Sequence, residues 1–115
     1  MGTDGRGAAK RRGHELFAPI EDAFLARPGV EVAPMFGSES LRIRGKVFAF
    51  VGFDGGLIVK LPADRVDTWV ATTAAAPMVM RERVMREWLV VPLSEAASWP
   101  DAVAEAFTYV DRITP

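Results

Sequence analysis

The sequence contains no cysteine and only one histidine among its 115 residues. Without cysteine there are no disulfides, cysteine-ligated zinc sites, iron–sulfur clusters or thiol nucleophiles. The single histidine, His14, excludes catalytic arrangements that need two imidazoles, and no second histidine or cysteine is available to share a metal with it. The nucleophile-elbow, phosphate-binding-loop and dinucleotide-binding patterns are also absent. We therefore predict a protein that is not an enzyme and that has no catalytic residue, metal or cofactor.

Long apolar runs are missing as well. The longest uncharged stretch, residues 68–80, is diluted by threonine, tryptophan and proline, whereas a transmembrane helix needs about 20 predominantly apolar residues. The N-terminal residues lack the apolar segment of a secretory signal. These absences predict a cytoplasmic protein that does not bind a membrane.

Charge is nearly balanced overall but unevenly placed. Residues 1–12 carry Arg6, Lys10, Arg11 and Arg12 against Asp4, a charge of +3, which leaves −4 for the rest of a chain whose total is −1. The pI of about 5.8 argues against a surface built throughout for nucleic acid, since such domains tend to lie above about 9. We predict a disordered basic leader over residues 1–13 and one domain over residues 14–115. A basic arm that binds phosphates is the alternative.

The first half of the chain changes from a helical to a strand period. Apolar residues recur at helical spacing from His14 to Arg27, and Pro19 places the start of this helix near Leu16 or Ala18. Alternation with period two begins at residues 30–32 and predicts strands over residues 40–44, 47–53 and 57–61, joined by tight turns. Consecutive strands joined in this way form an antiparallel meander.

The second half of the chain contains two further helices. Pro62 opens a middle helix, residues 72–77 have the composition of a loop, and residues 78–86 show no clear period. A strand follows over residues 87–92, and Ser98 is the expected N-cap of a C-terminal helix with Pro100 in its first turn. The predicted fold is therefore α+β: an antiparallel β-meander of about four to five strands packed with an N-terminal, a middle and a C-terminal helix.

Two clusters of basic residues are candidates for binding sites. Arg42, Arg44 and Lys46 form a possible basic binding patch, because the two arginines, at spacing two, would share one outward face and present positive charge to phosphates. The other interpretation is the solvated face of an edge strand, where charge discourages unwanted pairing.

The second basic cluster comprises Arg81, Arg83 and Arg86. It is interleaved with Glu82 and Glu87, so we predict ion-paired loop residues there. Neither cluster has recognisable aromatic platforms for stacking bases.

Methionines and tryptophans allow two interpretations. Methionine most often fills gaps in a core, but a group of methionines also lines adaptable grooves for partners. The core interpretation is the one we predict for Met35, Met78, Met80 and Met85. Trp88 and Trp99 each begin an element and are expected to anchor the sheet to a helix, with ligand stacking as the alternative.

Several short motifs occur in an order that resembles the TfoX N-terminal domain family. They are Met35-Phe36-Gly37, then Gly45-Lys46-Val47-Phe48-Ala49, then Leu57-Ile58-Val59-Lys60, and finally Met85-Arg86-Glu87-Trp88 with Pro92. The YjbR/MmcQ group is the nearest alternative. The resemblance spans residues 16–110 and implies a small bacterial α+β domain whose relatives include regulators of natural competence. It supplies no catalytic or cofactor residue, so Met35, Phe36, Gly37, Met85 and Trp88 are family-marking positions that we expect to be structural.

The resulting functional expectation is a non-catalytic regulatory module that binds another macromolecule, a protein in the first instance. Nucleic-acid binding through the leader and the basic patch is one alternative. A small-ligand binder or enzyme with a pocket near Trp88 and residues 78–85 is another. The sequence does not decide the oligomeric state.

Overall fold

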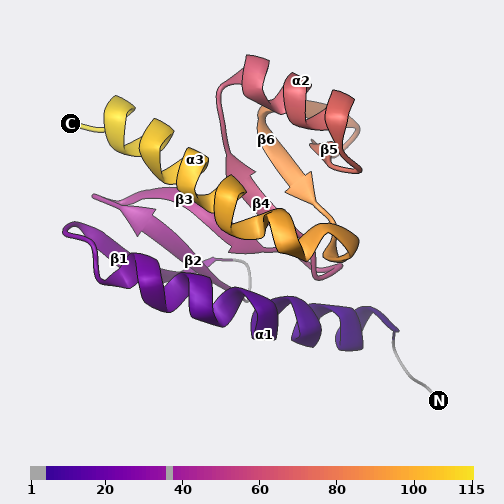
Figure 1. The fold of residues 1–115 in the computed structure, drawn as a ribbon, viewed down its shortest axis with the longest axis horizontal. Coiled ribbons are helices and arrows are strands. Elements are labelled where there is room, and N and C mark those ends of the chain that lie inside the picture. The colour runs from indigo at the N-terminus through magenta and orange to yellow at the C-terminus, as the bar shows by residue number, and fades with distance from the viewer. Residues whose placement is uncertain (1–4, 36–37) are drawn as a thin grey trace.

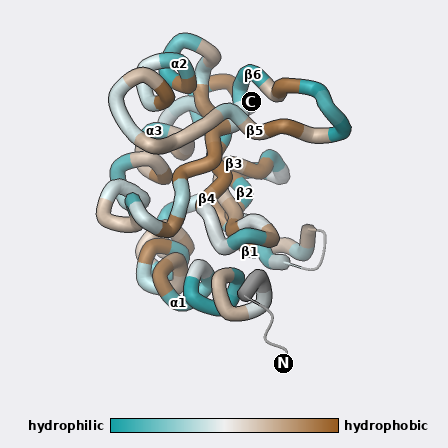
Figure 2. Tube along the Cα trace, turned by 90° about the vertical axis from the view of Figure 1, so that its right-hand side faces the viewer, coloured by the Kyte–Doolittle hydropathy of each residue, from teal (hydrophilic) through white to brown (hydrophobic). Residues whose placement is uncertain are grey.

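The computed structural model describes residues 5–35 and 38–115 and has an α+β fold (Figure 1). A six-stranded antiparallel sheet has the order β1-β2-β3-β4-β6-β5. Figure 2 shows the helices on one side of this sheet. The elements are α1 (Gly5–Leu25), β1 (Val30–Met35), β2 (Ser38–Ile43), β3 (Lys46–Val51), β4 (Leu57–Lys60), α2 (Ala63–Thr72), β5 (Ala76–Met80), β6 (Arg83–Val91), the 3-10 helix η1 (Leu93–Ser98) and α3 (Trp99–Ile113).

The core lies between the helices and one face of the sheet. Alternate residues of the central strands are buried there, among them Leu41, Val59 and Leu89. A bulge between Leu41 and Arg42 also turns Phe48 inward, where its ring packs edge-on against Phe24 and Phe107. The opposite face of the sheet carries no helix (Figure 2), so its apolar residues are available for the site described below.

The number of strands is slightly above the predicted four to five. β5 and the first half of β6 occupy residues for which the sequence predicts a loop or shows no period. They are joined by a two-residue turn in which Arg81 (φ 51°) and Glu82 (φ 67°) both have positive φ. Such turns usually contain glycine or asparagine, so this hairpin lacks the residues by which it would be recognised.

Helix α1 begins well before the predicted start. Residues 5–13, predicted as part of a disordered leader, are helical, and Pro19 lies inside the helix rather than in its first turn. The physical reason is a close approach of backbones: a Cβ atom on Gly13 would overlap the carbonyl of Gly55, in the turn after β3. Residues 1–4 lie outside the described residues.

Helix α3 begins where the sequence predicts, directly after Ser98, but the expected capping hydrogen bond does not form. Pro100 occupies the first turn, as expected. Ser98, however, has helical backbone angles and its side chain makes no capping hydrogen bond. Because η1 runs directly into α3, the backbone is already helical at Ser98, and a capping residue requires a non-helical conformation.

The partly buried His14 makes stability depend on pH. Burial lowers the pKa of its imidazole, and the charge of Lys10 one turn earlier lowers it further, while Glu39 opposes the shift. A lowered pKa means that the folded state disfavours protonation, so stability is full above the unfolded pKa and falls as the pH drops below about 6.5.

We expect His14→Gln to flatten this acid-side decline, because glutamine does not titrate. Urea unfolding of both proteins between about pH 7.5 and 5 measures it. Parallel losses of stability in the two proteins would show that His14 is not the titrating group.

Candidate binding pocket on the open face of the sheet

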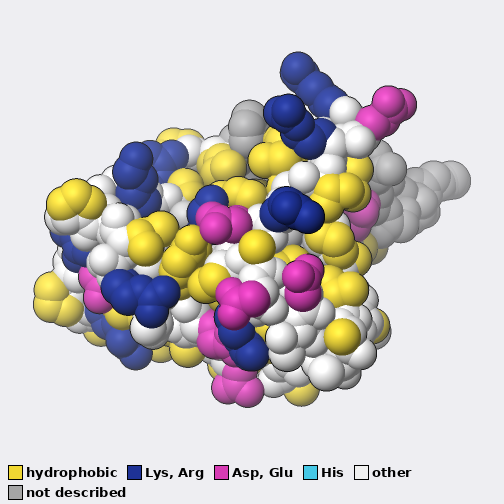
Figure 3. All heavy atoms as spheres, turned by 90° about the horizontal axis from the view of Figure 1, so that it is seen from above, with side chains coloured by type: hydrophobic (Ala, Val, Ile, Leu, Met, Phe, Trp, Pro, Cys, Tyr) yellow, Lys and Arg dark blue, Asp and Glu magenta, His cyan; other side chains and the backbone are white. Residues whose placement is uncertain are grey.

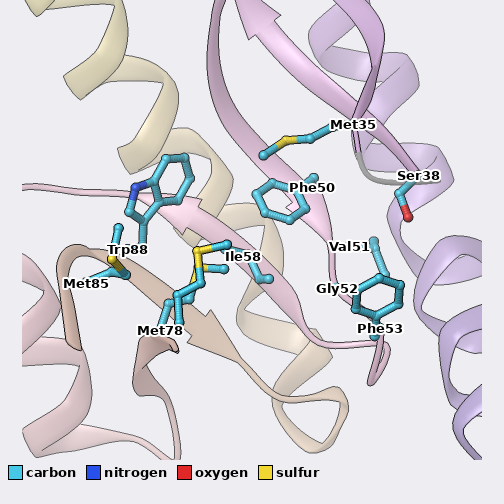
Figure 4. A pocket seen from close by; sticks show the side chains of 11 residues that line it. Met35, Ser38, Phe50, Val51, Gly52, Phe53, Ile58, Met78, Met85 and Trp88 are labelled. Carbon is cyan, nitrogen blue, oxygen red and sulfur yellow. The ribbon is translucent and has the colours of Figure 1, made fainter. Parts of the chain in front are cut away.

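An apolar pocket of about 320 Å³ lies on the face of the sheet that carries no helix (Figure 4). Phe50 and Ile58, which are paired in neighbouring strands, form its floor together with Trp88. Its lining residues, as far as the structure describes them, carry no ionisable side chain: Met35, Ser38, Phe50, Val51, Gly52, Phe53, Ile58, Met78, Met80, Met85 and Trp88. The pocket therefore offers van der Waals contact with apolar side chains to a ligand.

A break in strand register creates the pocket wall. Pro77 pairs with Leu89, but the next residue, Met78, pairs with Met85, so residues 86–88 are skipped on β6. An excess of residues on one strand bends it. The outer part of the β5–β6 hairpin, residues 78–85, consequently leaves the plane of the sheet and projects away from the helices (Figure 2).

The four methionines are not core residues, contrary to the prediction. All of them line the pocket, and Met80 is 43% exposed. Met78 and Met85 are directly paired across the hairpin, and Figure 4 shows their side chains near Trp88 and Ile58. The alternative interpretation, an adaptable groove, matches their positions. The methionine spacing of two in residues 78–80 was the available signal, because on a strand it places both side chains on one face.

The two tryptophans have different environments. Trp99 is fully buried and anchors α3 in the core, as predicted. Trp88 instead faces the pocket, where its ring meets Phe50 edge-on at a centroid distance of 6.1 Å. The Nζ atom of Lys60 lies 5.2 Å from the centroid of the Trp88 ring, a cation–π geometry that fixes the indole.

An ion pair and a hydrogen bond next to Trp88 connect the pocket to α3. Lys60 Nζ lies 3.2 Å from a carboxylate oxygen of Glu87, and the Tyr109 hydroxyl donates to the other oxygen at 3.0 Å. Burial raises the pKa of Tyr109, and its hydrogen bond to Glu87 raises it further. Glu87 is thus engaged by Lys60 and Tyr109.

The predicted basic patch is not assembled. Arg44 lies in the turn after β2 (φ 48°) rather than on the strand, so it does not share the outward face of Arg42. Its guanidinium donates to the Asp111 carboxylate at 2.9 Å and to the carbonyls of Asp111, Thr114 and Pro115. Positive charge at the C-terminal end of a helix is favourable, so Arg44 stabilises the C-terminal end of α3.

The side chains of Arg42 and Lys46, the other two residues of that patch, have different environments. Arg42 donates from Nη2 to the Pro34 carbonyl at 3.2 Å, and its Nε is buried without a hydrogen-bond partner. Lys46 is exposed. The three residues therefore present separate environments rather than one continuous cationic stripe.

The second basic cluster is not ion-paired, contrary to the prediction. Across residues 5–35 and 38–115, the only ion pair of Glu87 is with Lys60, and Arg81, Arg83 and Arg86 form none. All three arginines are exposed. Figure 3, the view from above Figure 1, shows basic and acidic side chains interspersed with exposed apolar ones.

The family-marking positions divide into two groups. Met35, Met85 and Trp88 line the pocket, whereas Phe36 and Gly37 lie outside the described residues.

Comparisons with protein-family models, curated proteins and solved structures each give no match. In the part of the chain that the structure describes, no helix is long and apolar enough to cross a membrane. Nor do those residues contain a group of at least three His, Asp or Glu side chains that could hold a metal.

Proposed function

We propose that this protein is a non-catalytic binding module that receives an apolar side chain of a partner protein in the methionine-lined pocket. The observation that carries the proposal is the pocket itself: an apolar concavity on a sheet face that no helix covers, walled by a projecting hairpin. Contiguous exposed apolar surface of this kind marks interaction sites. The motif resemblance to the TfoX N-terminal domain, whose relatives include regulators, agrees with a regulatory role in a bacterial cell.

The size and lining of the pocket favour a protein partner over a metabolite. Its volume of about 320 Å³ lies at the lower end of the range of about 300–1,000 Å³ for small-molecule sites. Among the lining side chains that the structure describes, only Ser38 and Trp88 bear an oxygen or nitrogen atom, whereas metabolite sites place several polar groups to fix orientation. An anchor side chain needs only a fitting apolar socket, and methionine adapts its shape to such anchors. A small apolar ligand remains the second candidate for the same pocket.

The nucleic-acid alternative has less support. It relied on the basic leader together with Arg42, Arg44 and Lys46, and the guanidinium of Arg44 is bound at the C-terminal end of α3. Binding through phosphates would weaken steeply with salt and would respond to Lys46→Ala.

A peptide-display selection against the folded protein tests the proposal. We expect enrichment of peptides with a large apolar residue, and about tenfold or greater loss of their affinity in Met85→Glu and Met80→Glu, because a carboxylate in the pocket is desolvated when the anchor enters. Met80 is 43% exposed, so its variant is expected to fold.

The matched control is Val84→Glu. Val84 lies on the same hairpin and is 55% exposed, but it does not line the pocket. The variant adds the same charge and is expected to retain affinity within about threefold. No enrichment, or peptides that bind both pocket variants as well as the wild type, would overturn the proposal. Binding of small apolar probes without peptides would favour the second candidate instead.

A further inference from the structure

The hairpin that walls the pocket carries positive charge that its surroundings do not neutralise. Arg83 pairs with Met80 across the hairpin, and residues directly opposite in an antiparallel pair project from the same face. Arg83 therefore belongs to the face that lines the pocket. Arg81 and Arg86 stand on either side of it in the sequence, and none of the three forms an ion pair with a described residue.

The nearby carboxylates do not cancel this charge. Glu87 is bound by Lys60 and Tyr109. Glu82 lies in the turn at the hairpin tip. Its single negative charge is outnumbered by the three positive charges of the arginines. The mouth of the pocket is thus apolar inside and cationic along its hairpin side.

Building on the proposed function, we infer that the partner segment is acidic: an apolar anchor side chain flanked by aspartate or glutamate. The anchor fills the pocket, and the flanking carboxylates meet Arg83 and its neighbours. Arginine suits this role because its planar guanidinium binds a carboxylate through two parallel hydrogen bonds. Complementary charge also accelerates encounter and selects against basic segments.

An anionic membrane is the competing partner for a basic and apolar hairpin. The positions of the residues favour the acidic peptide. The outermost residues of the hairpin are Arg81 and Glu82, so the tip that would enter a bilayer is charged. The methionines instead line a concave pocket, which matches a single anchor better than a flat lipid surface.

The test uses peptides from the display selection, resynthesised with their anchor unchanged and with acidic, neutral (Asn and Gln) or basic (Lys) flanks. Isothermal titration calorimetry at about 50 mM and 500 mM salt measures their affinities. We expect the acidic version to bind about tenfold more tightly than the neutral one at low salt, with most of this advantage lost at high salt.

Arg83→Glu is expected to remove the preference for acidic flanks. The control, Lys46→Glu, makes the same change of charge at an exposed residue outside the pocket lining, and should shift affinity by less than about twofold. Peptides that lose affinity in Met85→Glu but bind equally well with neutral or basic flanks would overturn this inference and leave the proposed function intact. Peptides indifferent to Met85→Glu would overturn the proposed function.

A sedimentation experiment with vesicles distinguishes an anionic membrane from an acidic peptide as the partner. Wild-type protein is sedimented with vesicles of phosphatidylcholine and phosphatidylserine. We expect it to remain in the supernatant. Sedimentation that is lost in Arg83→Glu, together with no preference for acidic peptides, would assign the cationic hairpin to lipid and overturn the inference.

Discussion

Trp99→Ala is expected to lower the free energy of unfolding by about 3–5 kcal/mol, a large part of the total of about 5–15 kcal/mol for a domain. Trp99 is fully buried where η1 joins α3, and it is the largest fully buried side chain in the core. Its indole N–H also donates to the Pro92 carbonyl at 3.4 Å. Truncation leaves a cavity and removes that donor, and both effects lower the free energy of unfolding. Urea unfolding monitored by circular dichroism measures the loss.

Trp88→Ala is the matched control for this loss. Trp88 is only partly buried and lines the open pocket, so its removal enlarges a space that is already exposed. We expect it to cost clearly less than Trp99→Ala, mainly the edge-on contact with Phe50 of about 0.5–1.5 kcal/mol. Equal losses in the two variants would contradict the assignment of Trp99 to the core and Trp88 to the pocket.

Gly55→Ala is expected to destabilise the protein and to release the first turns of α1 from the sheet. Gly55 has φ 84°, and a Cβ atom there would overlap the carbonyl of Ala9 in α1. The left-handed backbone costs a non-glycine residue about 1–2 kcal/mol, and the overlap adds the cost of overpacking, about 1–3 kcal/mol. Hydrogen exchange should show faster exchange in the first half of α1, in addition to the loss measured by urea unfolding.

Two glycine variants separate the two costs. Gly45 has φ 86° but nothing within 4 Å of a Cβ atom, so Gly45→Ala should show the backbone cost alone and leave exchange in α1 unchanged. Gly13→Ala meets the carbonyl of Gly55 without a positive φ, so it should show the overlap alone. If Gly45→Ala is as destabilising as Gly55→Ala, the contact with α1 contributes nothing.

The sequence predicts those elements whose faces differ in burial. The alternation around Leu41 and Ile43 predicts β2, because one face of that strand packs on the helices while the other does not. The stripe of Val103, Ala106 and Val110 predicts α3 for the same reason. In these segments local pattern and tertiary environment agree.

Other elements depend on contacts that leave no local pattern. The first half of α1 is held by a contact between Gly13 and Gly55, and glycine contributes nothing to an apolar period. The part of the hairpin around Val79 and Val84 is apolar on the face away from the pocket as well, with both residues more than half exposed, so the hairpin has no polar face by which its strands could be recognised.

The candidate site was foreseen only as an alternative. Methionines at spacing two are compatible with core or groove, and the choice depends on the register break between Pro77 and Met78, which one sequence does not reveal. The role of Arg44 was missed because its partner, Asp111, lies at the other end of the chain. Both errors arise from tertiary context, which overrides a two-residue period.

The bend in β6 separates the part of the β5–β6 hairpin that belongs to the sheet from the outer part that walls the pocket. Leu89 and Val90 pair with both neighbouring strands and belong to the sheet, whereas residues 78–80 and 83–85 pair only with each other. The side chains of the outer hairpin can therefore be replaced while the core on the far side of the sheet keeps its composition. Under the proposed function, the selectivity of the pocket can thus change through substitutions that cost little stability.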